Sequence, residues 1–274
     1  MSRIAARFAE SRHRALFVPF ITAGDPDFDT SSAILNALPE AGADLIELGM
    51  PFTDPMADGP AIQASSLRAL TAGATMARTF TLVRNFRQRD AKTPIVLMGY
   101  FNPIHALGTE TFIREASAAG ADGFIVVDLP PEEDEVLRVP AKAAGIEVVR
   151  LITPTTDEAR LARILEGASG FLYYASVAGV TGTKSFAEDE VREALLRIKK
   201  AARLPVAVGF GIRTPEEAAR IACLADAVVV GSAIVRVIGE KHAHGGKAIV
   251  PAVTELCRAL SVCVHGASGD RMRT

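Results

Sequence analysis

The sequence has little of three features that would each have assigned it to a particular class of protein. Its three cysteines lack metal-type spacing and are odd in number, which argues against a disulfide framework and for a reducing, cytoplasmic compartment. Acids and bases nearly balance at a formal charge of −2, so nothing points to nucleic acid or an anionic membrane. No apolar run approaches the roughly 18 residues of a membrane span, and no signal-peptide core precedes Leu16.

Apolar residues are plentiful instead, at 49% of the chain, which is enough for a large core. Eight short, nearly continuous apolar runs are typical of strands buried on both faces: 16–22, 44–48, 94–100, 123–127, 146–152, 170–175, 205–208 and 227–230. Between them lie segments of helical period: 28–40, 61–87 with a break at Gly73, 109–119, 132–144, 157–165, 188–202 and 215–222, followed by 248–260.

The ends of the expected helices repeat one pattern. Gly42, Gly120 and Gly145 each stand where a helix should stop and a strand should begin, and glycine tolerates the left-handed conformation needed there. The recurrence indicates a chain of like βα modules. We therefore predict a single-domain α/β fold over residues 1–274, a (β/α)8 TIM barrel, with a loose C-terminal tail after about residue 262. An open doubly wound sheet is the alternative.

Two acids stand out within residues 44–63. Glu47 is the one charge in an apolar run, and Asp58 follows in a loop rich in proline and glycine. An active site in such a barrel lies at the carboxyl ends of the strands, where two carboxyls in unlike settings can divide acid and base roles. The alternatives are that Asp58 caps the helix near Pro60 and that Glu47 pairs with a buried cation, although no Lys or Arg is near it in sequence.

Glycine-rich exits after the last two strands, at 209–214 and 231–233, predict a phosphate site, since glycine lets phosphate approach backbone N–H groups at a helix start. Their alternative is two tight turns. The small, polar stretch 176–184 predicts a lid or ligand clamp, the alternative being a merely disordered connection. His242 and His244 are better explained as solvated side chains than as metal ligands. No strand end offers an evident Schiff-base lysine, so a carbon–carbon cleavage would need a substrate that is its own electron sink.

Six stretches together resemble one known family. The run LIELGMPFTDPMADGPAIQ at 45–63 closely resembles the defining motif of tryptophan synthase alpha subunits. It is supported in order along the chain by FITAGDP at 20–26, MGYFNP at 98–103, GVTG at 179–182, GFGI at 209–212 and GSAIV at 231–235. The first motif is long and specific, whereas the phosphate glycines would fit several barrel families.

The resemblance implies a lyase that cleaves indole-3-glycerol phosphate to indole and glyceraldehyde 3-phosphate in tryptophan biosynthesis. Glu47 matches the general acid/base, and Asp58 matches the acid that stabilises the indole N–H as positive charge develops. The substrate-binding positions matched are Phe20, Tyr100, Ile125, Tyr173, Thr181, Gly182, Phe210, Gly211, Ile212, Gly231 and Ser232. Thr181 is the lid threonine expected to contact Asp58. The lid departs from the common pattern at Val177 and Lys184.

The resemblance also implies a partner, a beta subunit in an αββα heterotetramer that receives indole through a tunnel. Pro51, Asp54 and Asn102 match positions of the contact surface. No cofactor is expected in this chain, and pyridoxal phosphate is expected only in the beta subunit. Two alternatives stay open: another phosphosugar barrel, such as an isomerase or metal-dependent aldolase, and a non-catalytic barrel that activates its partner allosterically.

Overall fold

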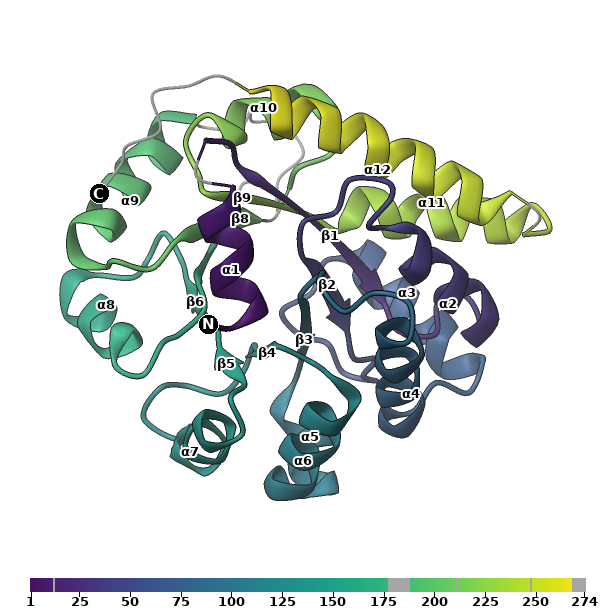
Figure 1. Ribbon diagram of the computed structural model, residues 1–274, viewed down its shortest axis with the longest axis horizontal. Coiled ribbons are helices and arrows are strands. Elements are labelled where there is room, and N and C mark those ends of the chain that lie inside the picture. Colours follow the sequence, from purple (N-terminus) through teal and green to yellow (C-terminus); the bar gives the residue numbers. More distant parts are fainter. Residues whose placement is uncertain (12, 177–187, 210, 247, 268–274) are drawn as a thin grey trace.

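The computed structural model describes residues 1–274 except 12, 177–187, 210, 247 and 268–274. Within the described residues, nine parallel strands form a nearly closed ring with helices around it (Figure 1), in the order β5-β4-β3-β2-β1-β9-β8-β7-β6. The strands are β1 (Leu16–Thr22), β2 (Ile46–Gly49), β3 (Ile95–Gly99), β4 (Gly123–Val126), β5 (Glu147–Val148), β6 (Arg150–Ile152), β7 (Leu172–Ala175), β8 (Val206–Gly209) and β9 (Ala227–Val230).

The ring closes at Val149. The run expected as one strand, 146–152, is divided there into β5, which pairs with β4, and β6, which pairs with β7. Val149 also donates its N–H to the Phe124 carbonyl at 3.1 Å. Because the two ends of the pairing order are consecutive in the chain, the sheet is a barrel whose fifth strand is in two pieces. The predicted (β/α)8 barrel is confirmed, and the doubly wound alternative is wrong.

Most of the helices follow the predicted segments, with shifts of a few residues at their ends, but Arg3–Glu10, Phe101–Leu107 and Ser232–Ala243 were not among those segments. They are α1 (Arg3–Glu10), α2 (Phe28–Ala37), α3 (Pro60–Thr71), α4 (Met76–Arg87), α5 (Phe101–Leu107), α6 (Thr109–Ala119), α7 (Glu135–Ala143), α8 (Glu158–Leu165), α9 (Glu188–Ala201), α10 (Pro215–Ala222), α11 (Ser232–Ala243) and α12 (Ile249–Gly266). The break at Gly73 is confirmed, since this glycine has φ +85° between α3 and α4.

The last helix corrects one expectation, the loose tail after about residue 262. α12 continues to Gly266, so the tail is helical beyond residue 262, and the rest of it, 268–274, lies outside the described residues. By length and mean hydropathy α12 is also long and apolar enough to cross a membrane, although Glu255 and Arg258 interrupt its apolar residues. In the barrel its apolar stripe, which includes Val253, Cys257 and Leu260, is buried where the helix packs on α10, α11, α2 and β1.

The unpredicted helix α1 closes the amino-terminal end of the ring. Its Ile4 is fully buried. A Cβ atom built on Gly123, where β4 begins, would lie 3.3 Å from Ile4 Cδ1, and one on Gly170, ahead of β7, would lie 3.6 Å from its Cγ2. Phe8 of the same helix lies against Phe171, with ring centroids 5.8 Å apart. This end of the barrel is filled, so a substrate has to enter at the other.

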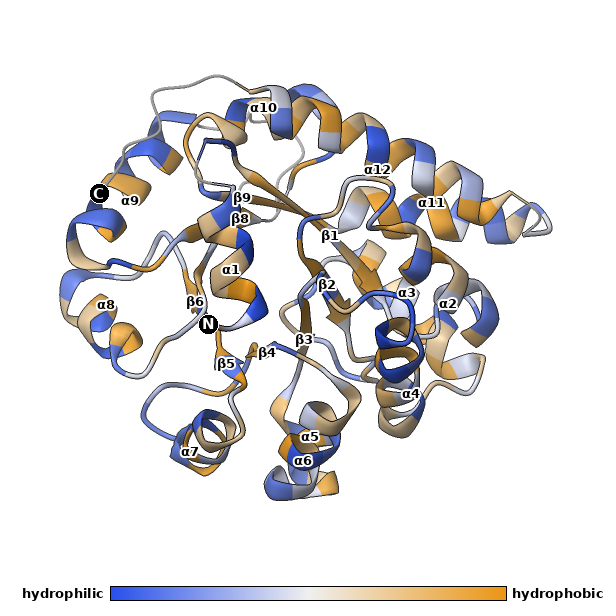
Figure 2. Cartoon of the chain, viewed as in Figure 1, coloured by the Kyte–Doolittle hydropathy of each residue, from blue (hydrophilic) through white to orange (hydrophobic). Residues whose placement is uncertain are grey.

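The core has two layers, because successive side chains of a strand point to opposite faces. In β1, Leu16, Val18 and Phe20 belong to the apolar cluster inside the ring, whereas Phe17 and Ile21 belong to the cluster between the ring and the helices. Figure 2 shows the same arrangement, with apolar strands at the centre and helices whose polar sides face outward.

Three aspartates at the amino-terminal ends of strands tie the ring together, in an arrangement we call the aspartate clasps. Each sits just before its strand and accepts a hydrogen bond of 2.8 to 2.9 Å from a backbone N–H of a neighbouring strand, the donors being Phe17 for Asp44, Ile95 for Asp122 and Val206 for Asp226. Each also contacts one or two basic side chains: Asp44 contacts Arg14 and His265, Asp122 contacts Arg3 and Arg87, and Asp226 contacts Lys199. Burial alone would raise the pKa of Asp44, but its hydrogen bonds lower it to about 2.

Candidate active site

Glu47 points into the ring because its neighbours in β2 do not. Ile46 and Leu48 belong to the outer apolar layer, so the side chain between them faces inward. Glu47 is 2% exposed, and its Oε2 atom has no hydrogen-bond partner. Among the described residues, no lysine or arginine forms an ion pair with it, so none of them is the buried cation partner of the alternative explanation. Burial, with the nearby charge of Asp58, raises the pKa of Glu47 to about 8.

Asp58 lies in the loop between β2 and α3, and it does not cap the helix. The N-cap of α3 is Gly59, and no side chain bonds to the first turn. Burial raises the pKa of Asp58 to about 6, although a hydrogen bond from the Tyr100 hydroxyl opposes the rise. The same hydroxyl accepts the Ala57 N–H at 3.1 Å, so Tyr100 holds the loop as well as the carboxyl. The structure thus provides two acids with pKa values on either side of 7.

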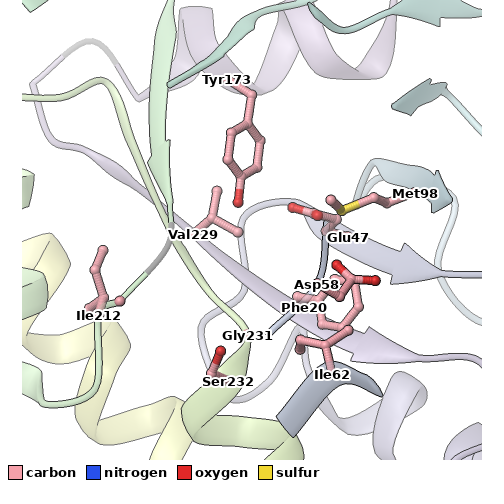
Figure 3. Close-up of a pocket in the computed structure, with 11 residues that line it drawn as sticks. Phe20, Glu47, Asp58, Ile62, Met98, Tyr173, Ile212, Val229, Gly231 and Ser232 are labelled. Atoms are coloured by element: carbon pink, nitrogen blue, oxygen red, sulfur yellow. The ribbon is translucent and has the colours of Figure 1, made fainter. Parts of the chain in front are cut away.

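Both acids line one cavity at the carboxyl ends of the strands, with about 430 Å³ of empty space. Figure 3 shows Glu47 and Asp58 on one side of it, and Ile212, Gly231 and Ser232 on the other, with the Tyr173 hydroxyl pointing toward the space between them. Tyr173 is 3% exposed. Burial and the two carboxylates raise its pKa well above the ordinary value, so it stays protonated at neutral pH.

Glycines at the strand ends make room for the two aromatic walls of the cavity. A Cβ atom on Gly49 would lie 2.5 Å from the Phe20 ring, and one on Gly209 would lie 2.0 Å from the Tyr173 hydroxyl. Gly209 therefore makes room for an aromatic ring. The exit at 209–214 contains two glycines, Gly209 and Gly211. Of these, Gly211 lines the cavity, and it has the left-handed conformation at φ +83°.

The helices that follow β8 and β9, namely α10 and α11, differ in whether a side chain already caps their first turn. The α10 start has a complete capping box, and Glu217 also accepts the N–H of Arg213 at 2.7 Å, so the N–H groups of Arg213, Thr214 and Glu217 already have acceptors. The α11 start has no side-chain cap, and its first residues, Gly231 and Ser232, line the cavity. Uncapped amides at a helix N-terminus favour an anion. The cavity can thus accept a phosphate at α11.

Of the predicted substrate-binding residues, six line this cavity: Phe20, Tyr173, Gly211, Ile212, Gly231 and Ser232. Tyr100 does not line it but forms a hydrogen bond with the Asp58 side chain. Ile125 is fully buried in the inner core. Thr181, Gly182 and Phe210 lie outside the described residues, as do most of the predicted lid and its departures at Val177 and Lys184.

The expected partner-contact residues lie on the rim at the same end of the barrel. Asp54, in the loop after β2, and Asn102, in α5 after β3, are exposed, and Pro51 is half-buried. Phe52 packs on Tyr100 with ring centroids 5.4 Å apart, which joins this rim to the loop that carries Asp58.

Sequence reasoning missed three residues that line the cavity, Ile62, Met98 and Val229. All three are apolar, so nothing distinguished them from core positions, although strand register offered a signal. Met98 pairs with Gly49 across β2 and β3, two residues beyond the partner of Glu47 and on the same face. Among the described residues, no group of three or more His, Cys, Asp or Glu side chains is placed to hold a metal ion.

Comparison with known proteins finds similarity over nearly the whole chain. The family model for the tryptophan synthase alpha chain matches residues 7–265. The tryptophan synthase subunit alpha of Legionella pneumophila str. Paris is 38% identical, with a TM-score of 0.90 over 96% of this chain and 98% of that one. A Mycobacterium tuberculosis tryptophan synthase structure is 34% identical, with a TM-score of 0.87 over 96% and 98% of the two chains. A structure from Aquifex aeolicus VF5 is 35% identical, with a TM-score of 0.86 over 97% and 100%.

Proposed function

This chain belongs to the tryptophan synthase alpha chain family, and on that premise we propose that Glu47 and Asp58 are the groups that carry out its reaction. The protein is a carbon–carbon lyase of tryptophan biosynthesis, which cleaves indole-3-glycerol phosphate to indole and glyceraldehyde 3-phosphate. The observation that supports the assignment of roles is a single cavity lined by two carboxyls, one with a pKa of about 8 and one with a pKa of about 6.

These pKa values give each acid its starting state at pH 7, with Glu47 protonated and Asp58 ionised. Glu47 gives its proton to C3 of the indole ring, which leaves positive charge on the ring N–H. The Asp58 carboxylate accepts a hydrogen bond from that N–H and stabilises the charge. Glu47 then takes the proton of the C3′ hydroxyl while the C3–C3′ bond breaks. The bonding electrons return to the ring, the aldehyde forms, and Glu47 ends protonated, as it began.

The cavity provides a place for each part of this substrate. The phosphate lies at the uncapped start of α11, beside Gly211 and Ser232, where backbone N–H groups can bind it. The indole ring lies on the opposite side, within reach of both acids and against Phe20 and Met98. The protonated ring is the electron sink, so the proposed chemistry needs neither an imine nor a metal.

Alpha chains of this family work with a beta subunit. We place the contact on the rim that carries Pro51, Asp54 and Asn102, where Met56 also leaves 78% of its surface exposed. The assembly we propose is an αββα heterotetramer in the cytoplasm. Indole passes to the beta subunit, where pyridoxal phosphate serves its condensation with serine. This chain itself needs no cofactor.

The test is the release of indole from indole-3-glycerol phosphate by the full chain, with and without a beta subunit. Glu47→Gln and Asp58→Asn should each lower kcat by roughly 10²- to 10⁴-fold, the usual contribution of acid–base catalysis. Glu133→Gln, an exposed acid at the same end of the barrel, is the control and should leave the rate unchanged. Turnover retained in both active-site variants would refute the roles assigned here. An inert wild type whose Glu47→Gln variant still stimulates a beta subunit would favour a non-catalytic partner.

A further inference from the structure

A pair of opposite charges, Arg68 and Asp25, lies next to the cavity, and the proposed mechanism does not use it. Arg68, in α3, donates from Nε and Nη2 to the two carboxylate oxygens of Asp25, each at 2.8 Å. The Asp25 side chain is 0% exposed and that of Arg68 is 23% exposed. Two parallel bonds between a guanidinium and a carboxylate fix both distance and orientation.

The guanidinium of Arg68 joins three elements of the barrel. Asp25 lies in the loop after β1, and Arg68 itself lies in α3. Nη2 also donates to the Val235 carbonyl in the first turn of α11, at 3.3 Å. One turn later a Cβ atom on Gly239 would come within 2.9 Å of Nη1, so α11 has a glycine where the guanidinium packs against it. α3 and α11 lie side by side in the ring (Figure 1).

Each of these elements also supplies part of the cavity wall. Phe20 comes from β1, Ile62 from α3 and Ser232 from α11, and Asp58 directly precedes α3. Figure 3 shows Ile62 and Phe20 beside Asp58, with Ser232 across the cavity. The acid side and the proposed phosphate side are thus carried by different helices, which Arg68 connects.

We propose that Arg68 is a positioning residue that sets the spacing between the acid-bearing loop and the phosphate-binding start of α11. The inference rests on the proposed function, because it takes the substrate to span both sides of the cavity. Lysine cannot replace the guanidinium, since a single ammonium cannot bind both oxygens of Asp25 side by side and reach the Val235 carbonyl as well.

The test compares a ligand that spans the cavity with ligands that occupy one side of it. For Arg68→Lys, kcat/KM for indole-3-glycerol phosphate should fall about 10-fold, chiefly through KM, because small displacements of a binding group cost factors of this size. The inhibition constants of indole and of glycerol 3-phosphate, measured separately, should change less than about twofold, since each ligand contacts one side only. Asp25→Asn keeps the bond to Val235 and should show the same pattern with a smaller loss.

Arg87→Lys is the matched control. It weakens another arginine–aspartate pair, with Asp122, at the opposite end of the barrel. It should lower the melting temperature without changing kcat/KM or either inhibition constant. If Arg68→Lys leaves kcat/KM unchanged, or weakens all three ligands equally, Arg68 does not set the spacing and the inference is wrong. An inactive wild type would instead remove the proposed function, and this inference with it.

Discussion

Replacing Glu47 by glutamine should remove activity and at the same time make the protein more stable at alkaline pH. In the unfolded chain this carboxyl loses its proton near pH 4.5, but in the folded protein it does so only near pH 8. Between those values the folded state holds one more proton than the unfolded state, so stability falls as the pH rises. Glutamine has no proton to lose and escapes this effect.

The size of the effect follows from the two pKa values. Moving the pKa from 4.5 to about 8 corresponds to roughly 5 kcal/mol, at about 1.4 kcal/mol for each tenfold change in proton affinity. Full burial of Glu47, at 2% exposure, justifies the conversion without a discount for solvent screening. Part of this cost is already present at pH 5. Between pH 5 and pH 8.5 the wild type should therefore lose roughly 3 to 4 kcal/mol relative to Glu47→Gln.

The assay is equilibrium urea unfolding of both proteins at pH 5, 7 and 8.5. Far-ultraviolet circular dichroism is the suitable probe, because the chain has no tryptophan. Asp58→Asn provides the internal comparison. Its pKa moves only from 3.8 to about 6, so the advantage of that variant should stop growing near pH 6, whereas that of Glu47→Gln grows to pH 8. A stability difference between Glu47→Gln and wild type that stays constant from pH 5 to 8.5 would show that Glu47 is not held protonated by burial.

Three further predictions concern the rate, the cavity wall and the far end of the barrel. The kcat of indole release should be greatest between about pH 6 and pH 8, falling on the acid side as Asp58 is protonated and on the alkaline side as Glu47 loses its proton; a profile flat from pH 5 to 9 would contradict the assigned roles. Gly209→Ala should displace the Tyr173 ring, because its Cβ would lie 2.0 Å from the hydroxyl, and should cost about 1–3 kcal/mol in urea unfolding together with activity; unaltered kinetics would show that the ring position does not matter. Asp44→Asn should lower stability by roughly 2 kcal/mol at neutral pH, since the folded pKa is about 2 against 3.8, and this deficit should shrink as the pH falls below 4 while kcat stays that of the wild type.

The sequence was sufficient to predict a site residue where that residue differed in polarity from its neighbours. Glu47 was conspicuous as the single charge in an apolar run, and its inward direction follows from strand alternation. The barrel was predictable because βα units of similar length recur and end in the same glycine-containing turn. Gly42 and Gly120, at φ +96° and +94°, have the left-handed conformation that this argument required.

The sequence was insufficient where the information lies in contacts between distant segments. Ile62, Met98 and Val229 resemble ordinary core residues until the cavity is seen. Arg68 and Asp25 are separated by 43 residues in the sequence, so their pairing is apparent only in the folded chain. The contact of Arg68 with α11 likewise depends on the packing of α3 against that helix. The exit at 209–214 was predicted only as a phosphate site, and the contact of Gly209 with Tyr173 was not predicted because that ring comes from another strand.

The aspartate clasps lie at one end of the barrel, and the residues proposed to contact substrate or partner lie at the other end. All three tie strands together at the end that α1 closes, well away from the loops that follow β2, β8 and β9. The hydrogen bonds of the aspartate clasps therefore involve none of the residues proposed to contact substrate or partner. We therefore expect that the loops at the open end of the barrel can be replaced by the corresponding loops of a relative, and that the pairing of the strands will be preserved.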